Sequence, residues 1–170
     1  RKGTGVLTAT CHGRASHAAK VPNDGRNAIL ALAEFLLAIA KSPAGQTDVM
    51  VNVGNIRGGT AATNIVPHFA VAEIDVRITR LADREPLLAR VRALAAEVGS
   101  RHECQIALSG GFNRPPKEVL PGEEAAFAEW QRAARDVGVA PFRKSRTRPA
   151  ARATSLPVGI PLPDPLWTLV

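Results

Sequence analysis

The alternation of strand-type and helix-type segments is the feature that most constrains this 170-residue chain. Four segments are rich in β-forming residues, and two longer segments between them carry apolar residues at helical spacing. Strands are predicted at about 5–13, 49–56, 69–79 and 104–109, and helices from Asp24 or Asn27 to Ser42 and from 83 to 99. This β-α-β-β-α-β order, with one apolar stripe per helix, predicts an α+β, ferredoxin-like sandwich in which both helices cover one face of a four-stranded antiparallel sheet.

The third predicted strand, residues 69–79, shows the clearest period of two. Val71, Glu73, Asp75 and Arg77 share one face, and the residues between them, all alanine, isoleucine or valine, share the other. One face of the sheet is therefore expected to be core, while the other is expected to contact water.

The sequence changes character after Phe112, which separates a first domain (1–112) from a remaining part (113–170). A third helix is predicted at about 123–137, with Phe127, Trp130, Ala134 and Val137 on one stripe and Gly138 closing it. The rest is an irregular tail rich in proline and arginine. Because the chain starts at Arg1 without a methionine, we expect it to be a piece of a longer protein.

The basic balance of the chain, a net charge of +7 and a pI near 10.4, raises the possibility of nucleic-acid binding. More than half of the excess lies in residues 139–170, which carry five basic residues and one acidic residue. A base-stacking sheet displays aromatic side chains, yet the four predicted strands contain only Phe69. A nucleic-acid-binding ferredoxin-like module is therefore kept as an alternative, and no nucleic-acid partner is expected.

Two cysteines, Cys11 and Cys104, lie far apart in sequence without a Cys-x-x-Cys pair. We interpret them as buried thiols of a reducing compartment, which favours a cytoplasmic location. We expect no signal peptide, and the sequence contains no apolar run as long as a membrane span, so no membrane partner is expected.

His17 is the first candidate functional residue, because it lies in a loop between the first strand and the first helix. The small neighbours Ala15, Ser16, Ala18 and Ala19 leave room for a ligand. A solvated loop histidine is an equally good interpretation, and a stand-alone hydrolase that uses Ser16 with His17 is a further alternative.

The loop from Arg57 to Pro67 is the second candidate. Gly58, Gly59 and Asn64 suit a loop that offers backbone N–H groups and one amide to an anion, although a wide hairpin without ligand fits as well. Arg77 is the third candidate, because arginine binds carboxylates in a bidentate manner. It could equally pair with Glu73 or Asp75.

The four histidines, His12, His17, His68 and His102, do not fall at the spacings of zinc ligands. No metal site and no cofactor are therefore predicted in this chain.

Several of these segments, taken in order, closely resemble the dimerisation or lid domain of the M20 family of zinc-dependent peptidases and amidohydrolases, in its glutamate carboxypeptidase-like branch. The matching segments are Gly13-Arg14-Ala15-Ser16-His17-Ala18, Pro22 with Gly25-Arg26-Asn27-Ala28-Ile29, Asn52-Val53-Gly54, Gly58-Gly59-Thr60, Asn64-Ile65-Val66-Pro67, Ile74-Asp75-Val76-Arg77 and the segment 110–116. The resemblance covers roughly residues 1–138 and implies the same sandwich fold for residues 1–112. It also implies that 113–170 are a partial, divergent remnant of the catalytic domain.

The resemblance further implies a role for each candidate residue. His17 would reach the active site of a partner subunit and donate to the oxyanion, while Asn64, Arg77 and Gly59 would bind substrate. Two zinc ions would sit in the catalytic domain of the parent enzyme, which would cleave an amide bond next to a free carboxylate in a small peptide or N-acyl amino acid. The chain would form a homodimer and be inactive alone. A homodimerisation module from a decayed gene is the remaining alternative.

Overall fold

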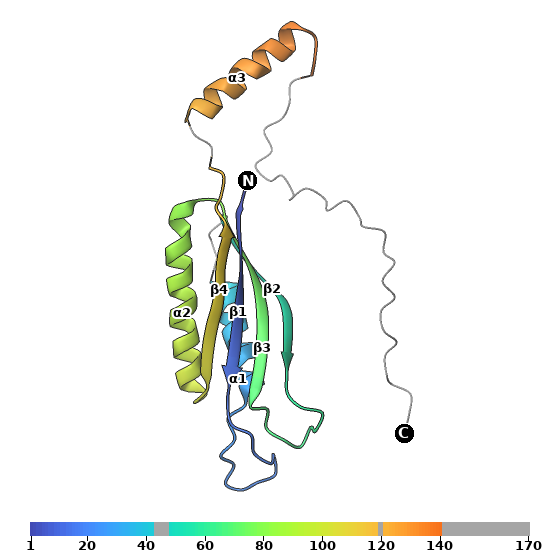
Figure 1. Ribbon diagram of the computed structural model, residues 1–170, viewed down its shortest axis with the longest axis vertical. Coiled ribbons are helices and arrows are strands. Elements are labelled where there is room, and N and C mark those ends of the chain that lie inside the picture. The colour runs from blue at the N-terminus through green and yellow to red at the C-terminus, as the bar shows by residue number, and fades with distance from the viewer. Residues whose placement is uncertain (43–47, 119–120, 141–170) are drawn as a thin grey trace, which may run out of the picture.

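The computed structural model describes residues 1–42, 48–118 and 121–140. The elements in chain order are β1 (Gly3–His12), α1 (Ala28–Lys41), β2 (Val49–Gly58), β3 (Phe69–Ile78), the short 3-10 helix η1 (Leu81–Asp83), α2 (Arg84–Arg101), β4 (Gln105–Arg114) and α3 (Pro121–Asp136). Figure 1 shows a sheet backed by α1 and α2, with α3 standing apart from it. The predicted order of strands and helices is confirmed.

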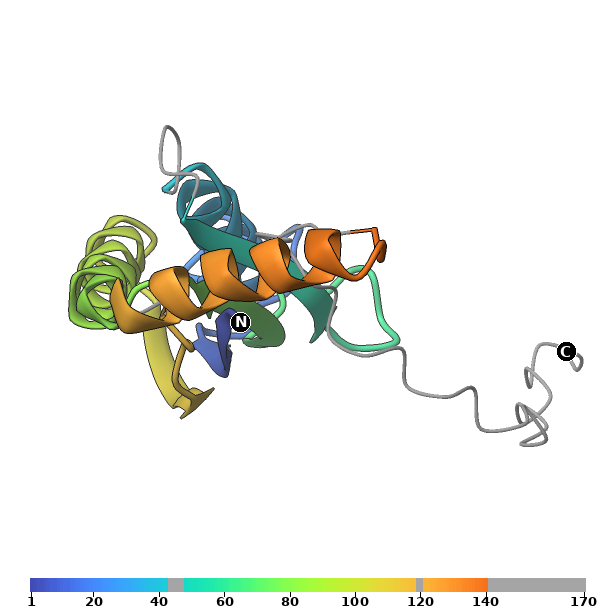
Figure 2. The ribbon, with the colours of Figure 1, turned by 90° about the horizontal axis from the view of Figure 1, so that it is seen from above.

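The strands form one four-stranded sheet in the order β2-β3-β1-β4, and every neighbouring pair is antiparallel. Seen from above, α1 and α2 lie on the same side of this sheet (Figure 2). α1 packs on β1, β2 and β3, while α2 packs on β4. The α+β sandwich predicted from the sequence is therefore the observed fold.

The core lies between the sheet and the two helices, and it follows the predicted period of two. On β3, Ala70, Ala72, Ile74, Val76 and Ile78 are buried, while Val71, Asp75 and Arg77 are only partly covered and Glu73 is exposed. Phe35 of α1 and Val91 of α2 are among the largest fully buried side chains that face this layer. Apolar burial of this kind is the main stabilising term in such a fold.

The two cysteines lie at this layer. Cys11 is buried and Cys104 is half-buried, and both are free thiols. Desolvation raises the pKa of Cys11 to about 12, with a further contribution from the neighbouring Cys104. A thiol with such a pKa is almost entirely protonated near neutral pH and is a poor nucleophile. The contribution of Cys104 to this pKa shows that the two cysteines are neighbours in space, although 92 residues separate them in sequence.

The predicted end of α2 at Gly99 is wrong, because the helix continues to Arg101. Gly99 is buried, and a Cβ placed there would lie 2.9 Å from the carbonyl oxygen of Cys104. The glycine therefore permits close approach of the following turn, in which Glu103 takes the left-handed conformation with a φ of 50°.

β4 also differs from its predicted end, since it passes through the Gly110-Gly111 pair and continues to Arg114. Gly110 has a φ of 87°, and a Cβ there would meet the carbonyl oxygen of Val6 at 2.3 Å. The pairing of β1 with β4 shifts register between Thr4 and Gly5, close to this point. Gly110 thus permits a left-handed backbone conformation inside the strand instead of terminating it, and the register shift follows beyond the glycine pair, at Asn113.

α3 (Pro121–Asp136) lies close to its predicted range of 123–137, and Gly138 closes it as predicted. The N–H of Val139 donates to the carbonyl of Ala134 at 2.8 Å, and the N–H of Gly138 donates to that of Arg135 at 3.1 Å. With a φ of 72° at Gly138, this is a Schellman cap. The apolar side of the helix lines a groove of about 500 Å³ with exposed Trp130 and Val137. The predicted tail from residue 141 onward lies outside the described residues.

Candidate functional site

Two loops meet at the end of the sheet where β1 ends and β3 begins, at the bottom of Figure 1. The first loop, residues 13–27, carries His17, and the second, residues 59–68, carries Asn64. The N–H of Gly13 donates to the backbone carbonyl of His68 at 2.8 Å, and the N–H of Ala28 donates to the backbone carbonyl of Pro67 at 2.9 Å. Both ends of the His17 loop are therefore fixed to the second loop.

The middle of the His17 loop is held in the same way. His17 forms an isolated antiparallel bridge with Ile65. On either side of it, the N–H of Ala18 donates to the carbonyl of Asn64, and the N–H of Val66 donates to that of Ser16, both at 2.8 Å. This short two-stranded segment brings His17 and Asn64 together, although 46 residues separate them in sequence.

The contact from Ala19 favours one tautomer of the His17 ring. Nδ1 accepts a hydrogen bond from the N–H of Ala19 at 3.2 Å. A ring nitrogen that accepts carries no proton, so the neutral imidazole has its proton on Nε2. Nε2 lies 3.4 Å from Nδ2 of Asn64. With the proton on Nε2 these two atoms both donate and cannot hydrogen-bond to each other, so both are left to donate to a third group. An oxygen that carries negative charge would satisfy both donors.

A second set of contacts comes from the returning arm of the His17 loop. Oγ of Ser16 donates to Oδ1 of Asp24 at 3.1 Å, and Nζ of Lys20 pairs with the same oxygen at 3.2 Å. These two hydrogen bonds, that of Lys20 first, lower the pKa of Asp24. Because the hydroxyl of Ser16 donates to Asp24, the geometry gives no support to a Ser16–His17 nucleophile pair.

Gly59 has a backbone reason to be glycine. It has a φ of 84° at the start of the second loop, and its N–H donates to the carbonyl of Phe69 at 3.1 Å. A Cβ at this position would lie 3.3 Å from Cδ1 of Ile29. Gly59 therefore forms the turn that leads into the Asn64 loop.

Arg77 lies at the opposite end of the sheet from His17 and Asn64. It is eight residues beyond Phe69 on β3, a separation of about 26 Å along the strand. Its Nε donates to Oδ2 of Asp75 at 2.7 Å on the open face of the sheet. The three side chains predicted for one site are thus not brought together within one protomer.

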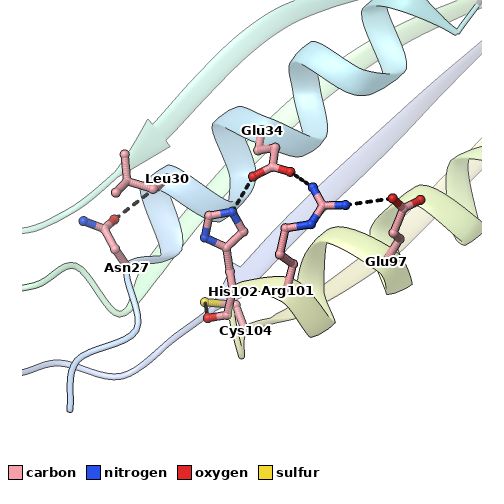
Figure 3. Close-up of polar contacts among 7 residues, drawn as sticks. All are labelled: Asn27, Leu30, Glu34, Glu97, Arg101, His102 and Cys104. Carbon is pink, nitrogen blue, oxygen red and sulfur yellow. Dashed lines mark hydrogen bonds and ion pairs between the residues drawn. The ribbon is translucent and has the colours of Figure 1, made fainter.

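His102, directly after the end of α2, contacts Glu34 of α1 (Figure 3). Its Nε2 contacts Oε2 of Glu34 at 2.6 Å, and Arg101 bridges Glu34 and Glu97. The hydrogen bond with His102, with a further contribution from the charge of Arg101, lowers the pKa of Glu34 despite desolvation. This network ties the two helices together. Within the described residues no group of three or more histidine, cysteine, aspartate or glutamate residues could hold a metal ion.

The fold and the pair of loops define a class: a two-layer α+β domain that presents a loop histidine and an asparagine at one end of its sheet. A family model described as the peptidase dimerisation domain of the M20 peptidases matches residues 1–103. The chain therefore belongs to the M20 peptidase dimerisation domain family, as its sequence motifs indicated. This assignment implies self-association through the domain.

Similar proteins agree with this assignment. The chain is 28% identical over 133 residues to N-acetyldiaminopimelate deacetylase of Shouchella clausii, covering 76% of this chain and 35% of that protein. It is 30% identical over 127 residues to succinyl-diaminopimelate desuccinylase of Paracoccus denitrificans, covering 72% and 33%. Among solved structures, aminopeptidase PepT of Bacillus cereus shares the fold, with a TM-score of 0.70 at 23% identity, covering 83% of this chain and 37% of that one.

The chain thus spans about a third of the length of the curated relatives that it matches. Among the helices in the described part of the chain, none combines the length and the apolar character needed to cross a bilayer.

Proposed function

We propose that this chain is the lid and dimerisation part of an M20-type hydrolase, and that its His17 serves the active site of a partner subunit. The observation that carries this proposal is the 3.4 Å approach of Nε2 of His17 to the amide nitrogen of Asn64 on two exposed loops, where both can act as N–H donors. Preorganised N–H donors directed at developing negative charge stabilise the tetrahedral intermediate of acyl transfer. His17 and Asn64 would donate to that oxyanion.

The catalytic metal would be held outside the described residues, which contain no group able to bind it. Zinc, when bound in the catalytic half, would activate the attacking water. The role left to this chain is to bind and orient the substrate and to donate hydrogen bonds.

Arg77 would bind the free carboxylate of the substrate. Its Nε is engaged by Asp75, which fixes the plane of the guanidinium and leaves the edge formed by the two Nη atoms for a carboxylate. Because Arg77 and His17 lie at opposite ends of the sheet, one subunit would supply Arg77 and its partner would supply His17 and Asn64. A complete site would therefore require the dimer.

The dimer would form through α1 and the edge strand β2. Leu30 and Leu37 lie on one side of α1 and are 59% and 63% exposed, which is unusual for large apolar side chains on a helix that otherwise packs into the core. β2 is an unpaired edge beside this helix, and two such edges can pair around a twofold axis. We call this surface, Leu30 and Leu37 with the β2 edge, the α1–β2 face.

The names of the relatives indicate the substrate class. One removes an acetyl group and another a succinyl group from diaminopimelate, and a third, from Enterobacter agglomerans, hydrolyses indole-3-acetyl-aspartic acid. We therefore propose that the parent enzyme cleaves an amide bond next to a free carboxylate, in an N-acyl amino acid or small peptide of the cytoplasm. Residues 113–170 would be the remnant of the catalytic half, and α3 within them, with its exposed Trp130, would pack against the rest of that half.

A direct test uses the purified chain alone. We expect it to bind zinc no more tightly than an unrelated protein of similar charge, and to hydrolyse neither N-acyl amino acids nor dipeptides with or without added zinc. Isothermal titration calorimetry and a ninhydrin assay of released amine measure the two quantities. Tight zinc binding, or zinc-dependent release of amine by the chain alone, would contradict the proposal.

A further inference from the structure

The loop that carries His17 also contains Asn23, whose side-chain amide makes one hydrogen bond through its oxygen and another through its nitrogen. Oδ1 of Asn23 accepts the N–H of Gly25 at 2.9 Å, which closes an Asx turn. Since this contact commits the oxygen, the nitrogen must face the other way. Nδ2 donates to the carbonyl of Ala18 at 3.2 Å.

The peptide that Asn23 contacts is the one that orients His17. The carbonyl of Ala18 and the N–H of Ala19 belong to the same planar peptide group, so they point in opposite directions. Asn23 binds the carbonyl, and the N–H on the other side donates to Nδ1 of His17 at 3.2 Å. Rotation of this peptide would turn its carbonyl toward Nδ1 and remove the donor.

We propose that Asn23 is a positioning residue that fixes the tautomer of His17 through the Ala18–Ala19 peptide. With the peptide held, Nδ1 accepts and the proton of the neutral ring stays on Nε2, the nitrogen that faces Asn64. Hydrogen bonds in series also polarise one another, so the contact from Asn23 strengthens the N–H donor of Ala19. This inference deepens the proposed function and rests on it for its catalytic meaning.

The other hydrogen bonds of the His17 loop do not contact the carbonyl of Ala18. The backbone bonds to the second loop reach Ala18 through its N–H and Ser16 through its carbonyl, and so do not contact the carbonyl of Ala18. Asp24 contacts the side chains of Ser16 and Lys20. Among the hydrogen bonds between residues in the described part of the chain, the one from Asn23 holds the carbonyl of this peptide.

Two substitutions separate the positioning role from a merely structural one. Asn23→Asp keeps an oxygen for the N–H of Gly25 and so retains the Asx turn, but it places a second oxygen against the carbonyl of Ala18. Asn23→Ala removes both contacts. Asn113→Ala is the matched control, because Asn113 is an exposed asparagine with one side-chain hydrogen bond, from Thr4, at the far end of the sheet.

The measurement is long-range ¹H–¹⁵N NMR of the histidine rings in the full 170-residue chain, at a pH where the imidazole is neutral. The His17 signals are assigned by their loss in His17→Ala. In the unsubstituted chain we expect an unprotonated Nδ1 and a protonated Nε2. In Asn23→Asp and Asn23→Ala the two ¹⁵N shifts should move toward each other, and the amide of Ala19 should exchange about fivefold to tenfold faster. Asn113→Ala should change neither quantity.

A protonated Nδ1 in the unsubstituted chain would overturn the proposal, and so would unchanged shifts and exchange in the folded Asn23→Asp variant. If Asn23→Ala fails to fold, Asn23→Asp alone decides. The measurement needs neither zinc nor activity, so a negative result leaves the role of His17 in a partner's site intact. Conversely, normal turnover of the His17→Ala enzyme would refute the catalytic role of His17. It would leave the tautomer measured in the unsubstituted chain as it is.

Discussion

Replacing His17 with alanine in the complete enzyme, formed by this lid and its catalytic half, is expected to lower kcat about 10²–10³-fold, because one preorganised donor to the oxyanion is lost. The effect should fall on kcat more than on KM, since this donor acts on charge that develops in the transition state. Steady-state kinetics on an N-acyl amino acid measure both. Metal analysis should find the zinc content unchanged, because His17 is proposed to bind substrate oxygen and not metal.

His12→Ala is the matched control for this substitution. His12 is an exposed histidine at the same end of the sheet, where its ring packs edge-on against Phe69 at a centroid distance of 5.5 Å. Its loss should leave kcat within about twofold of the unsubstituted enzyme. Loss of zinc in His17→Ala, or equal losses of kcat in both variants, would refute the proposed role of His17.

Replacing Leu37 with lysine is expected to break the dimer. An interface with twofold symmetry contains each residue twice. Burial of one leucine side chain contributes about 1.5–3 kcal/mol, so its loss from both copies should raise the dissociation constant about 10²–10⁴-fold. Lysine is a good helix former, so α1 itself should persist. Sedimentation equilibrium of the 170-residue chain measures the effect directly.

Leu81→Lys provides the control, since Leu81 is also a largely exposed leucine, 53% accessible, but lies in η1 outside the α1–β2 face. It should leave the dimer unchanged. In the complete enzyme, Leu37→Lys should lose activity together with the dimer, because each active site would then lack the partner's His17. A Leu37→Lys protein that remains dimeric at micromolar concentration would show that the dimer uses another face.

The main lines of the fold could be predicted from the sequence because apolar periodicity reports burial directly. The alternation from Phe69 to Ile78 separated the buried face of β3 from the open face residue by residue. The ends of elements were less predictable where a glycine serves close packing instead of chain termination. Gly99 and Gly110 have the local appearance of stop signals, and only the neighbouring backbone of Cys104 and Val6 explains why each element continues past them.

The candidate site could be predicted in part. The motifs pointed to His17, Asn64, Gly59 and Arg77, but no sequence pattern shows that the first two meet while Arg77 lies at the far end of β3. That separation follows from the strand order and the length of β3. Asn23 was not recognised as part of the site. The Asn23-Asp24-Gly25 run was visible as a turn, but its second contact, with the carbonyl of Ala18, depends on how the loop folds back.

The central claim, that His17 acts across the dimer, is tested most directly with a hybrid of two inactive subunits. One subunit carries His17→Ala and the other carries Arg77→Ala, and the hybrid dimer is isolated through two different affinity tags. If His17 serves the partner, one of the two sites has both residues and the other has neither, so the hybrid should recover about half of the unsubstituted activity. If His17 serves its own subunit, each site lacks one residue, and a hybrid as inactive as both parents would contradict the account.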